Sequence, residues 1–191
     1  TIFKNINKLS KNGKYELSLY NVSTRQWEYV IIDDRIPCND RKWYDIPRPL
    51  FAQPNENELY ILLIEKAFAK LSGSYNNLSG GYPALAWLVL TGCEDLEFWS
   101  ITEDGWNLGS PVLDKCRENP WNFQQLWLYG SNIYKSNYGM FDYLKRCDIS
   151  NYVMSCSIGG EEMEHLRSDG LVERHAYSII RVYDDNDLKM I

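Results

Sequence analysis

Two histidines and five cysteines are the side chains in this 191-residue chain that could support nucleophilic catalysis. A catalytic thiol needs a lowered pKa, which a helix N-terminus or a neighbouring imidazolium provides. Cys93 is expected at the C-terminal end of a helix, where the dipole disfavours a thiolate, and Cys156 lies among apolar residues of an expected strand. The remaining three, Cys38, Cys116 and Cys147, have no supporting context. None of the five is therefore predicted to be a nucleophile.

The two histidines differ in their surroundings. His165 lies within an acidic segment, residues 161–173, which is typical of a solvated loop. His175 follows this segment and opens an expected strand, a position from which a rigid scaffold can present a general base to a cleft. From the residues alone, both a structural and a catalytic role for His175 stay open. A metal site formed by both histidines and the acidic loop is disfavoured, because no ligand spacing is recognisable.

The elements that would position these residues begin with a β-hairpin over residues 14–33. Leu17 and Leu19 alternate with polar residues in its first strand, and Trp27, Tyr29 and Ile31 resume the alternation in its second. An irregular loop with three prolines follows, to about residue 54. The first half of the chain therefore begins with antiparallel β structure.

Two helices are predicted next. The first has Asn57 as its N-cap, Glu58 in its first turn and Gly73 just after its end. The second covers residues 83–91 and is followed by Gly92, with its core-facing positions at Leu85, Leu88 and Val89.

The second half of the chain has weaker patterns. They predict helices over residues 120–129 and 140–147, a buried strand over 152–158, and a strand over 175–183 that turns at 184–187. Strands, then helices, then strands indicate an α+β fold with antiparallel pairing.

Composition excludes several classes of function. Twenty-six acidic against twenty basic residues give a formal charge of −6, which disfavours nucleic-acid binding. No apolar stretch is long enough for a transmembrane segment. An odd number of cysteines without a CxxC pair is typical of a reducing compartment, so we expect a cytoplasmic protein.

Several segments, taken together and in order, resemble the catalytic core of the calpain family. They are GKY (13–15), WEYVIIDDRIP (27–37), ELYILLIEKAFAKL (58–71), GSY (73–75), LSGG (78–81), CSI (156–158), GLV (170–172) and HAYS (175–178). The resemblance covers most of residues 13–92 and 152–183, whereas residues 93–151 match poorly.

The resemblance implies a papain-like, calcium-dependent cysteine endopeptidase whose catalytic core has two lobes. Residues 1–92 would be the later half of the cysteine-bearing lobe, and residues 93–191 the earlier part of the histidine-bearing lobe. It also implies that His175 is the general base and acid, that Gly81 contacts the substrate backbone, and that Glu58 ligates calcium. The alternative for Glu58 is a first-turn acid that complements the helix dipole. Protein substrates are expected.

Departures from the family pattern are equally informative. The Gly-Asp-Cys-Trp motif of the nucleophile, with its preceding oxyanion glutamine, and the Asn-Pro-Trp-Gly motif are absent from these 191 residues. Asn119-Pro120-Trp121 imitates the latter motif but lies upstream of the histidine, and Asn186 is a weak substitute.

We therefore expect a fragment of a calpain-like core that depends on the remainder of that core and is inactive alone. The alternative is a calpain-like module that has lost catalysis and serves binding or regulation.

Arg174 is a further departure, because the family usually has glycine before the histidine. If the backbone is extended there, residues 174 and 175 point to opposite sides, and Arg174 crowds the path of the substrate without disturbing the histidine. Arg174 is therefore predicted to affect substrate binding, unless its side chain points into solvent.

Overall fold

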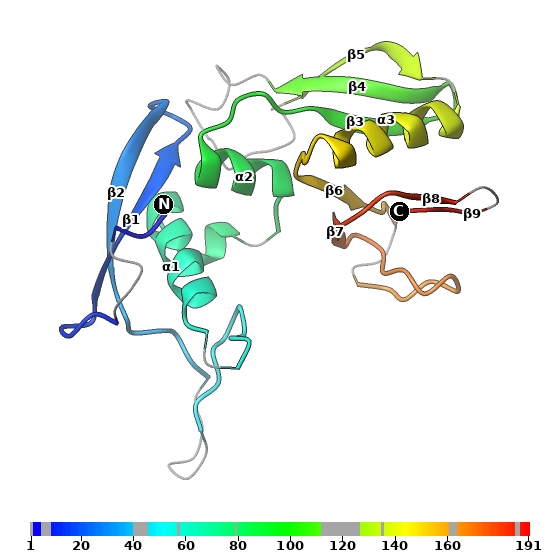
Figure 1. Cartoon of the computed structure of the whole chain (residues 1–191). Helices are drawn as coiled ribbons and strands as arrows, with labels where there is room; N and C mark the ends of the chain where they lie inside the picture. Colours follow the sequence, from blue (N-terminus) through cyan, green and yellow to red (C-terminus); the bar gives the residue numbers. More distant parts are fainter. Residues whose placement is uncertain are drawn as a thin grey trace. The chain divides into compact units, whose positions relative to one another are not determined.

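The computed structural model describes residues 2–4, 9–39, 46–56, 58–78, 80–111, 127–134, 136–160, 164–185 and 188–191 (Figure 1). The chain divides into two compact units. The first unit consists of Thr1–Asp95 and Val112–Leu126, and the second of Leu96–Pro111 and Trp127–Ile191. Helices and antiparallel strand pairs occur together, which confirms the predicted α+β class.

The first unit opens with the predicted hairpin, formed by β1 (Lys14–Asn21) and β2 (Gln26–Asp33). Leu17 and Leu19 are fully buried, as the alternation indicates. In β2 the buried residues are Val30 and Ile32, whereas Trp27, Tyr29 and Ile31 are exposed. The register explains this phase, because Leu17 pairs with Val30 and directly paired residues share one face of the sheet.

Helix α1 (Tyr60–Ser72) packs against this hairpin, and its two ends compare differently with the prediction. Gly73 ends the helix in a left-handed conformation with φ 95°, as predicted. The predicted start is too early: Leu59 is the N-cap, without a side-chain cap, and Glu58 precedes the helix. The residue predicted as the N-cap, Asn57, lies outside the described residues. The backbone N–H of Glu58 donates instead to the carbonyl of Asn55, at 3.0 Å, in a separate turn.

Lysines of α1 attach the helix to the second strand of the hairpin. Lys66 Nζ lies 2.5 Å from Asp33 Oδ1 and from the carbonyl oxygen of Arg35. Lys70 Nζ donates to the carbonyl of Ile31 at 2.6 Å. These lysines therefore provide hydrogen-bond donors for backbone carbonyls and a carboxylate at the end of β2.

A 3₁₀ turn (Tyr75–Leu78) and helix α2 (Pro83–Thr91) complete the regular elements in the described part of the first unit. The bounds of α2 agree with the prediction: Pro83 occupies the first turn, and Gly92 ends the helix with φ 66°. Leu85, Leu88 and Val89 are buried, also as predicted.

The second unit contains a sheet that the sequence patterns did not predict. Strands β3 (Phe98–Thr102), β4 (Gly105–Pro111) and β5 (Trp127–Tyr134) pair antiparallel in that order. The predicted helix over residues 120–129 is wrong for its last three residues, which begin β5, while residues 120–126 lie outside the described part.

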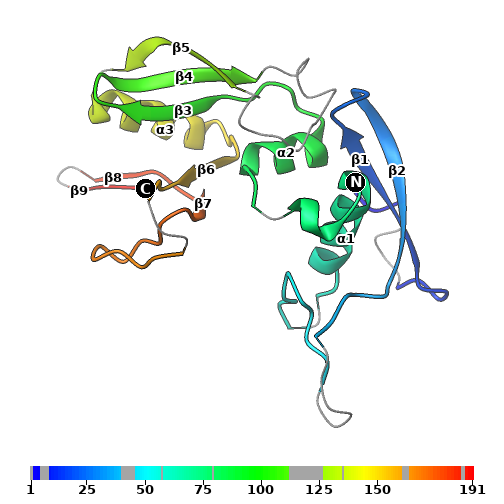
Figure 2. The same ribbon diagram turned by 180° about the vertical axis from the view of Figure 1, so that it is seen from behind.

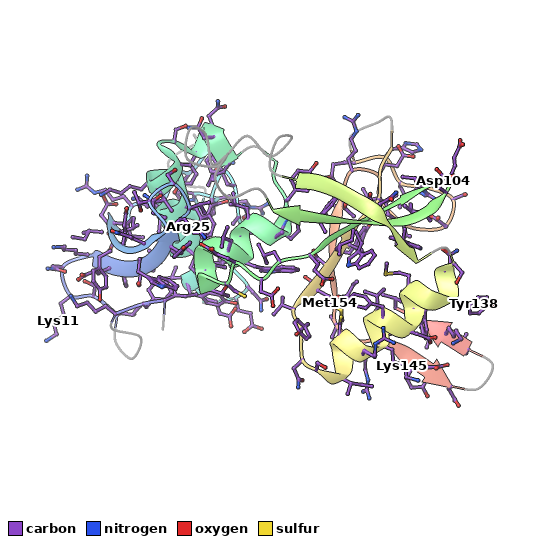
Figure 3. All side chains as sticks on the ribbon, turned by 90° about the horizontal axis from the view of Figure 1, so that it is seen from above. Lys11, Arg25, Asp104, Tyr138, Lys145 and Met154 are labelled. Atoms are coloured by element: carbon purple, nitrogen blue, oxygen red, sulfur yellow. The ribbon has the colours of Figure 1, made fainter. Side chains whose placement is uncertain are left out.

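Helix α3 (Asn137–Ile149) includes the predicted helix 140–147 and extends beyond it at both ends. Ser136 caps it, because its hydroxyl accepts a hydrogen bond from the Gly139 amide at 3.2 Å. Lys145, labelled in Figure 3, pairs with Asp184 at 2.8 Å and so connects α3 to the C-terminal hairpin.

Two short hairpins complete the second unit (Figure 2). Strand β6 (Met154–Ser157) pairs with β7 (Ala176–Ile179), and β8 (Tyr183–Asp185) pairs with β9 (Leu188–Met190). The strand predicted over 152–158 is shorter and is not buried, since none of its residues is in the core. The strand predicted over 175–183 is interrupted at residues 180–182, and the predicted turn at 184–187 lies partly outside the described residues.

In the part of the chain that is described, no helix is long and apolar enough to cross a membrane.

Candidate active site

His175 lies directly before β7, at the end of the β6–β7 hairpin. Its carbonyl accepts a hydrogen bond from the Ile158 amide at 3.4 Å, and the neighbouring Arg174 amide donates to the Ile158 carbonyl at 2.9 Å. The hairpin ladder therefore continues past the last strand residue and fixes the backbone on which the imidazole is carried.

The imidazole ring contacts the side chains of Glu164 and Tyr177. Its Nδ1 lies 3.2 Å from Oε1 of Glu164, and the ring meets Tyr177 edge-on at 5.1 Å between centroids. The His175 side chain is 48% exposed. A half-exposed imidazole with a carboxylate at one nitrogen can exchange protons at the other, which is the chemistry of a general base and acid.

The side chain of Arg174 bonds to the backbone that follows β6. Its Nε donates to the Gly160 carbonyl at 3.0 Å, and its backbone has φ 52°, in the left-handed region. The extended backbone required by the alternation argument is therefore absent, since residue 174 lies in a turn and the strand begins at Ala176. A left-handed position explains why glycine would be favoured here, because a side chain raises the energy of that conformation.

The residues predicted in the first unit are both exposed. Gly81 lies between Gly80 and Tyr82, the N-cap of α2. Glu58 precedes α1, so its alternative role as a first-turn acid is wrong. Gly81 and Glu58 belong to one unit and Arg174 and His175 to the other, and within the second unit the structure brings the latter pair together with Glu164.

The described residues do not form a calcium site by themselves. Among them, no three His, Cys, Asp or Glu side chains are grouped so that they could hold a metal ion. A calcium ion takes about six to eight oxygen ligands, and Glu58 supplies one carboxylate. Calcium binding would therefore require further ligands.

One cysteine, Cys156, has surroundings that disfavour a thiolate, in line with the prediction. Cys156 lies in β6 opposite Tyr177, and partial burial of its sulfur raises the pKa of the thiol. A smaller fraction of this cysteine is therefore present as thiolate at neutral pH than of an ordinary cysteine. By residue, Cys38, Cys93 and Cys156 are all exposed and Cys147 is half-buried, whereas Cys116 lies outside the described residues.

A cavity of about 900 Å³ in the second unit was not anticipated from the sequence. Its walls come from β3, β4, α3, β6, β7 and the C-terminal segment, and they are mostly apolar. Three of the isoleucines that line it are largely exposed: Ile101, Ile180 and Ile191 are 62%, 92% and 63% exposed. The apolar side chains of this unit are therefore incompletely packed against one another.

Comparison with known proteins places these features in one family. The family model for calpain family cysteine proteases matches residues 2–191. The chain is 29% identical to the calpain-type cysteine protease DEK1 of Zea mays over 87% of its length, 32% identical to a calpain of Schistosoma mansoni over 84%, and 30% identical to Calpain-A of Drosophila melanogaster over 82%. It spans 6%, 17% and 15% of the lengths of these relatives. The chain belongs to the calpain family of cysteine proteases.

Proposed function

We propose that this chain is the part of a calpain-type cysteine endopeptidase that supplies the catalytic histidine, His175. The observation that carries the proposal is the imidazole at the end of the β6–β7 hairpin, half-exposed and with Nδ1 beside a carboxylate. Membership of the calpain family supports the same role.

The imidazole acts first as a base and then as an acid. It takes the proton of a cysteine thiol elsewhere in the complete protein, and the resulting thiolate attacks the carbonyl carbon of a peptide bond. The carbon–nitrogen bond then breaks while the imidazolium gives its proton to the leaving amine. Water, deprotonated by the same imidazole, hydrolyses the thioester and releases the acid product.

Gly81 and Arg174 are proposed to contact the substrate. Gly81 is exposed and lacks a side chain, so a peptide backbone can approach it closely. Arg174 is exposed beside His175 and is proposed to affect peptide binding more than chemistry. The substrates would be proteins of the cytoplasm, the compartment indicated by the cysteine composition.

Calcium dependence is part of the proposal, with Glu58 as one ligand. A hard cation prefers carboxylate oxygens, and the exposed carboxylate of Glu58 is of this type. The other ligands would come from the remainder of the catalytic core.

The alternative function is a regulatory module without catalysis. The nucleophile motif is not among these 191 residues, and Arg174 replaces the family's usual glycine. The identity of the residue at the nucleophile position of the complete protein separates the two functions, since only cysteine permits the proposed reaction.

The test compares two histidine variants of the complete protein in calcium-stimulated cleavage of casein. His175→Ala is expected to abolish cleavage, whereas His165→Ala, in the same acidic segment, is expected to retain it. Full cleavage by the His175→Ala variant would contradict the proposed role.

A further inference from the structure

The turn before β1 contains an asparagine followed by a glycine, Asn12-Gly13, which is the only such pair in the sequence. Asn12 is exposed, and Lys11, labelled in Figure 3, lies in the same turn. We propose that Asn12 is a site of spontaneous modification, where the chain converts its own asparagine to aspartate and isoaspartate through a cyclic imide. The turn holds the electrophile, the nucleophile and the hydrogen-bond donors that this reaction needs.

The reaction begins when the backbone nitrogen of Gly13 attacks Cγ of the Asn12 amide. A bond forms between this nitrogen and Cγ, and the bond from Cγ to Nδ2 breaks. The proton lost by the Gly13 nitrogen reaches Nδ2 through water, so that Nδ2 leaves as ammonia. Water then opens the cyclic imide, giving isoaspartate when it attacks the backbone carbonyl and aspartate when it attacks Cγ. The reaction consumes water, releases ammonia and leaves a new carboxylate.

Two donors contact the oxygen of the reacting amide. Asn12 Oδ1 accepts hydrogen bonds from the Ser10 hydroxyl at 2.7 Å and from the Lys14 backbone amide at 3.2 Å. The attack places negative charge on this oxygen, and donors already aimed at it stabilise that charge more than they stabilise the neutral amide. Ser10 is held in place by two bonds, since its hydroxyl also accepts from the Lys14 amide at 3.0 Å and its own amide donates to the Tyr15 hydroxyl at 3.3 Å.

The fold requires glycine at the attacking position. Gly13 has φ 68°, and a Cβ placed on it would lie 2.6 Å from both carboxylate oxygens of Asp34. A side chain is therefore disfavoured by the left-handed backbone and excluded by the Asp34 carboxylate. The lack of a side chain also leaves the nitrogen of residue 13 free of steric hindrance toward Cγ of Asn12. The constraint that keeps glycine in this turn thus also makes Asn12 reactive.

Another asparagine of the same hairpin provides an internal comparison. Asn21 Oδ1 also accepts hydrogen bonds from backbone amides, those of Ser23 at 2.9 Å and Thr24 at 3.3 Å. The residue after it is Val22, which is branched at Cβ and is buried. The branched side chain crowds the backbone nitrogen, and its burial restricts the movement that an attack would require. Asn21 is therefore expected to persist while Asn12 reacts.

The modification changes the start of the hairpin. It adds a carboxylate next to Gly13, which the Asp34 carboxylate already contacts. Isoaspartate also adds a methylene group to the backbone just before Lys14, the residue that pairs with Asp33 at the beginning of β1. Charge repulsion and the altered register both oppose this pairing, so the first unit becomes less stable as the protein ages.

The test incubates the folded 191-residue chain at neutral pH and follows each asparagine by peptide mapping with mass spectrometry. Electron-transfer fragmentation distinguishes isoaspartate from aspartate. We expect both products at residue 12, formed about tenfold or more faster than any product at residue 21, a difference of about 1.4 kcal/mol in barrier. Conversion of Asn12 no faster than that of Asn21 would overturn the proposed site.

Variants of Ser10 test the contribution of the turn. Ser10→Ala removes a donor to Asn12 Oδ1 and is expected to slow conversion about three- to tenfold, the effect of one hydrogen bond. Ser10→Thr keeps the hydroxyl and is the matched control, with a rate close to that of the unsubstituted chain. Circular dichroism checks that both variants keep their fold. An unchanged or faster rate in Ser10→Ala would overturn activation by the turn.

Discussion

The indole of Trp27 packs over Gly92, the residue that ends α2. A Cβ placed on Gly92 would lie 2.8 Å from Cζ2 of Trp27, closer than side chains tolerate, and the glycine has φ 66°. Trp27 is in β2, so this contact connects the end of a helix to the hairpin of the same unit. Residue 92 must therefore adopt a left-handed backbone conformation and must also lack a side chain.

We expect Gly92→Ala to lower the free energy of unfolding by about 2–4 kcal/mol, because the strain of a left-handed residue adds to a steric overlap. Urea denaturation measures the change. Gly80→Ala is the matched control: its φ is 77°, but nothing lies within 4 Å of the added Cβ. The control should lose only about 1–2 kcal/mol. Equal losses in both variants would show that the Trp27 contact has no energetic effect.

Arg174 gives the opposite expectation. Because its φ is 52°, Arg174→Gly should relieve backbone strain and raise the free energy of unfolding by up to about 1 kcal/mol, after the greater freedom of glycine in the unfolded chain is subtracted. Arg174→Ala separates the two contributions, since it removes the hydrogen bond to Gly160 but keeps the strain. A Gly variant no more stable than the Ala variant would contradict this explanation.

The same substitution tests the proposed effect on substrate. In a complete, active protein, Arg174→Gly is expected to lower KM with little change in kcat. The side chain that it removes would crowd the bound peptide equally in the ground state and in the transition state. A tenfold rise in kcat at constant KM would instead indicate that Arg174 disturbs His175.

Features of the fold that depend on local sequence were predictable. Gly73 and Gly92 end helices because glycine adopts the left-handed conformation easily, and this requirement is visible in the sequence itself. The start of α1 was misplaced because Asn57 and Glu58 satisfy a local capping rule, whereas the backbone forms a separate turn before Leu59.

Features that depend on distant pairing were not predictable. The β3–β4 hairpin is local, since only the two-residue turn Glu103-Asp104 separates its strands, but β5 pairs with β4 from a segment far along the chain. In the site, the loop-to-strand position of His175 was predictable from the sequence. The contact with Glu164 was not, because the backbone pairing of the loop determines it.

Asp184 makes the stability of the second unit dependent on pH. The hydrogen bond from Lys145 holds the pKa of its carboxyl below the usual value. A carboxyl with a lowered folded-state pKa contributes stability above its unfolded pKa of about 4, and this contribution is lost as the pH falls through the folded value. We expect Asp184→Asn to reduce the fall in Tm between pH 6 and pH 3.

The partner residue provides the control for this experiment. Lys145→Gln should flatten the same part of the pH profile, but less than Asp184→Asn does, because Asp184 also pairs with Lys189 at 3.7 Å. Combining the two substitutions should add little to Asp184→Asn alone, because both remove the Lys145–Asp184 pair. Fully additive effects of the two substitutions would show that the pair does not determine the acid sensitivity.

The last prediction concerns what this chain does on its own. His175 has no catalytic thiol to activate within these 191 residues, so we expect no casein cleavage, with or without calcium. We also expect no tight calcium binding in titration calorimetry, because the described residues contain no cluster of three acidic or other metal-ligating side chains. Calcium-stimulated cleavage by this chain that disappears in His175→Ala would contradict the first expectation.

In the complete protein, by contrast, Glu58→Ala should weaken calcium binding, with Glu56→Ala, two residues earlier and also exposed, as the matched control. Equal calcium affinity of the complete protein and its Glu58→Ala variant would remove Glu58 from the metal site.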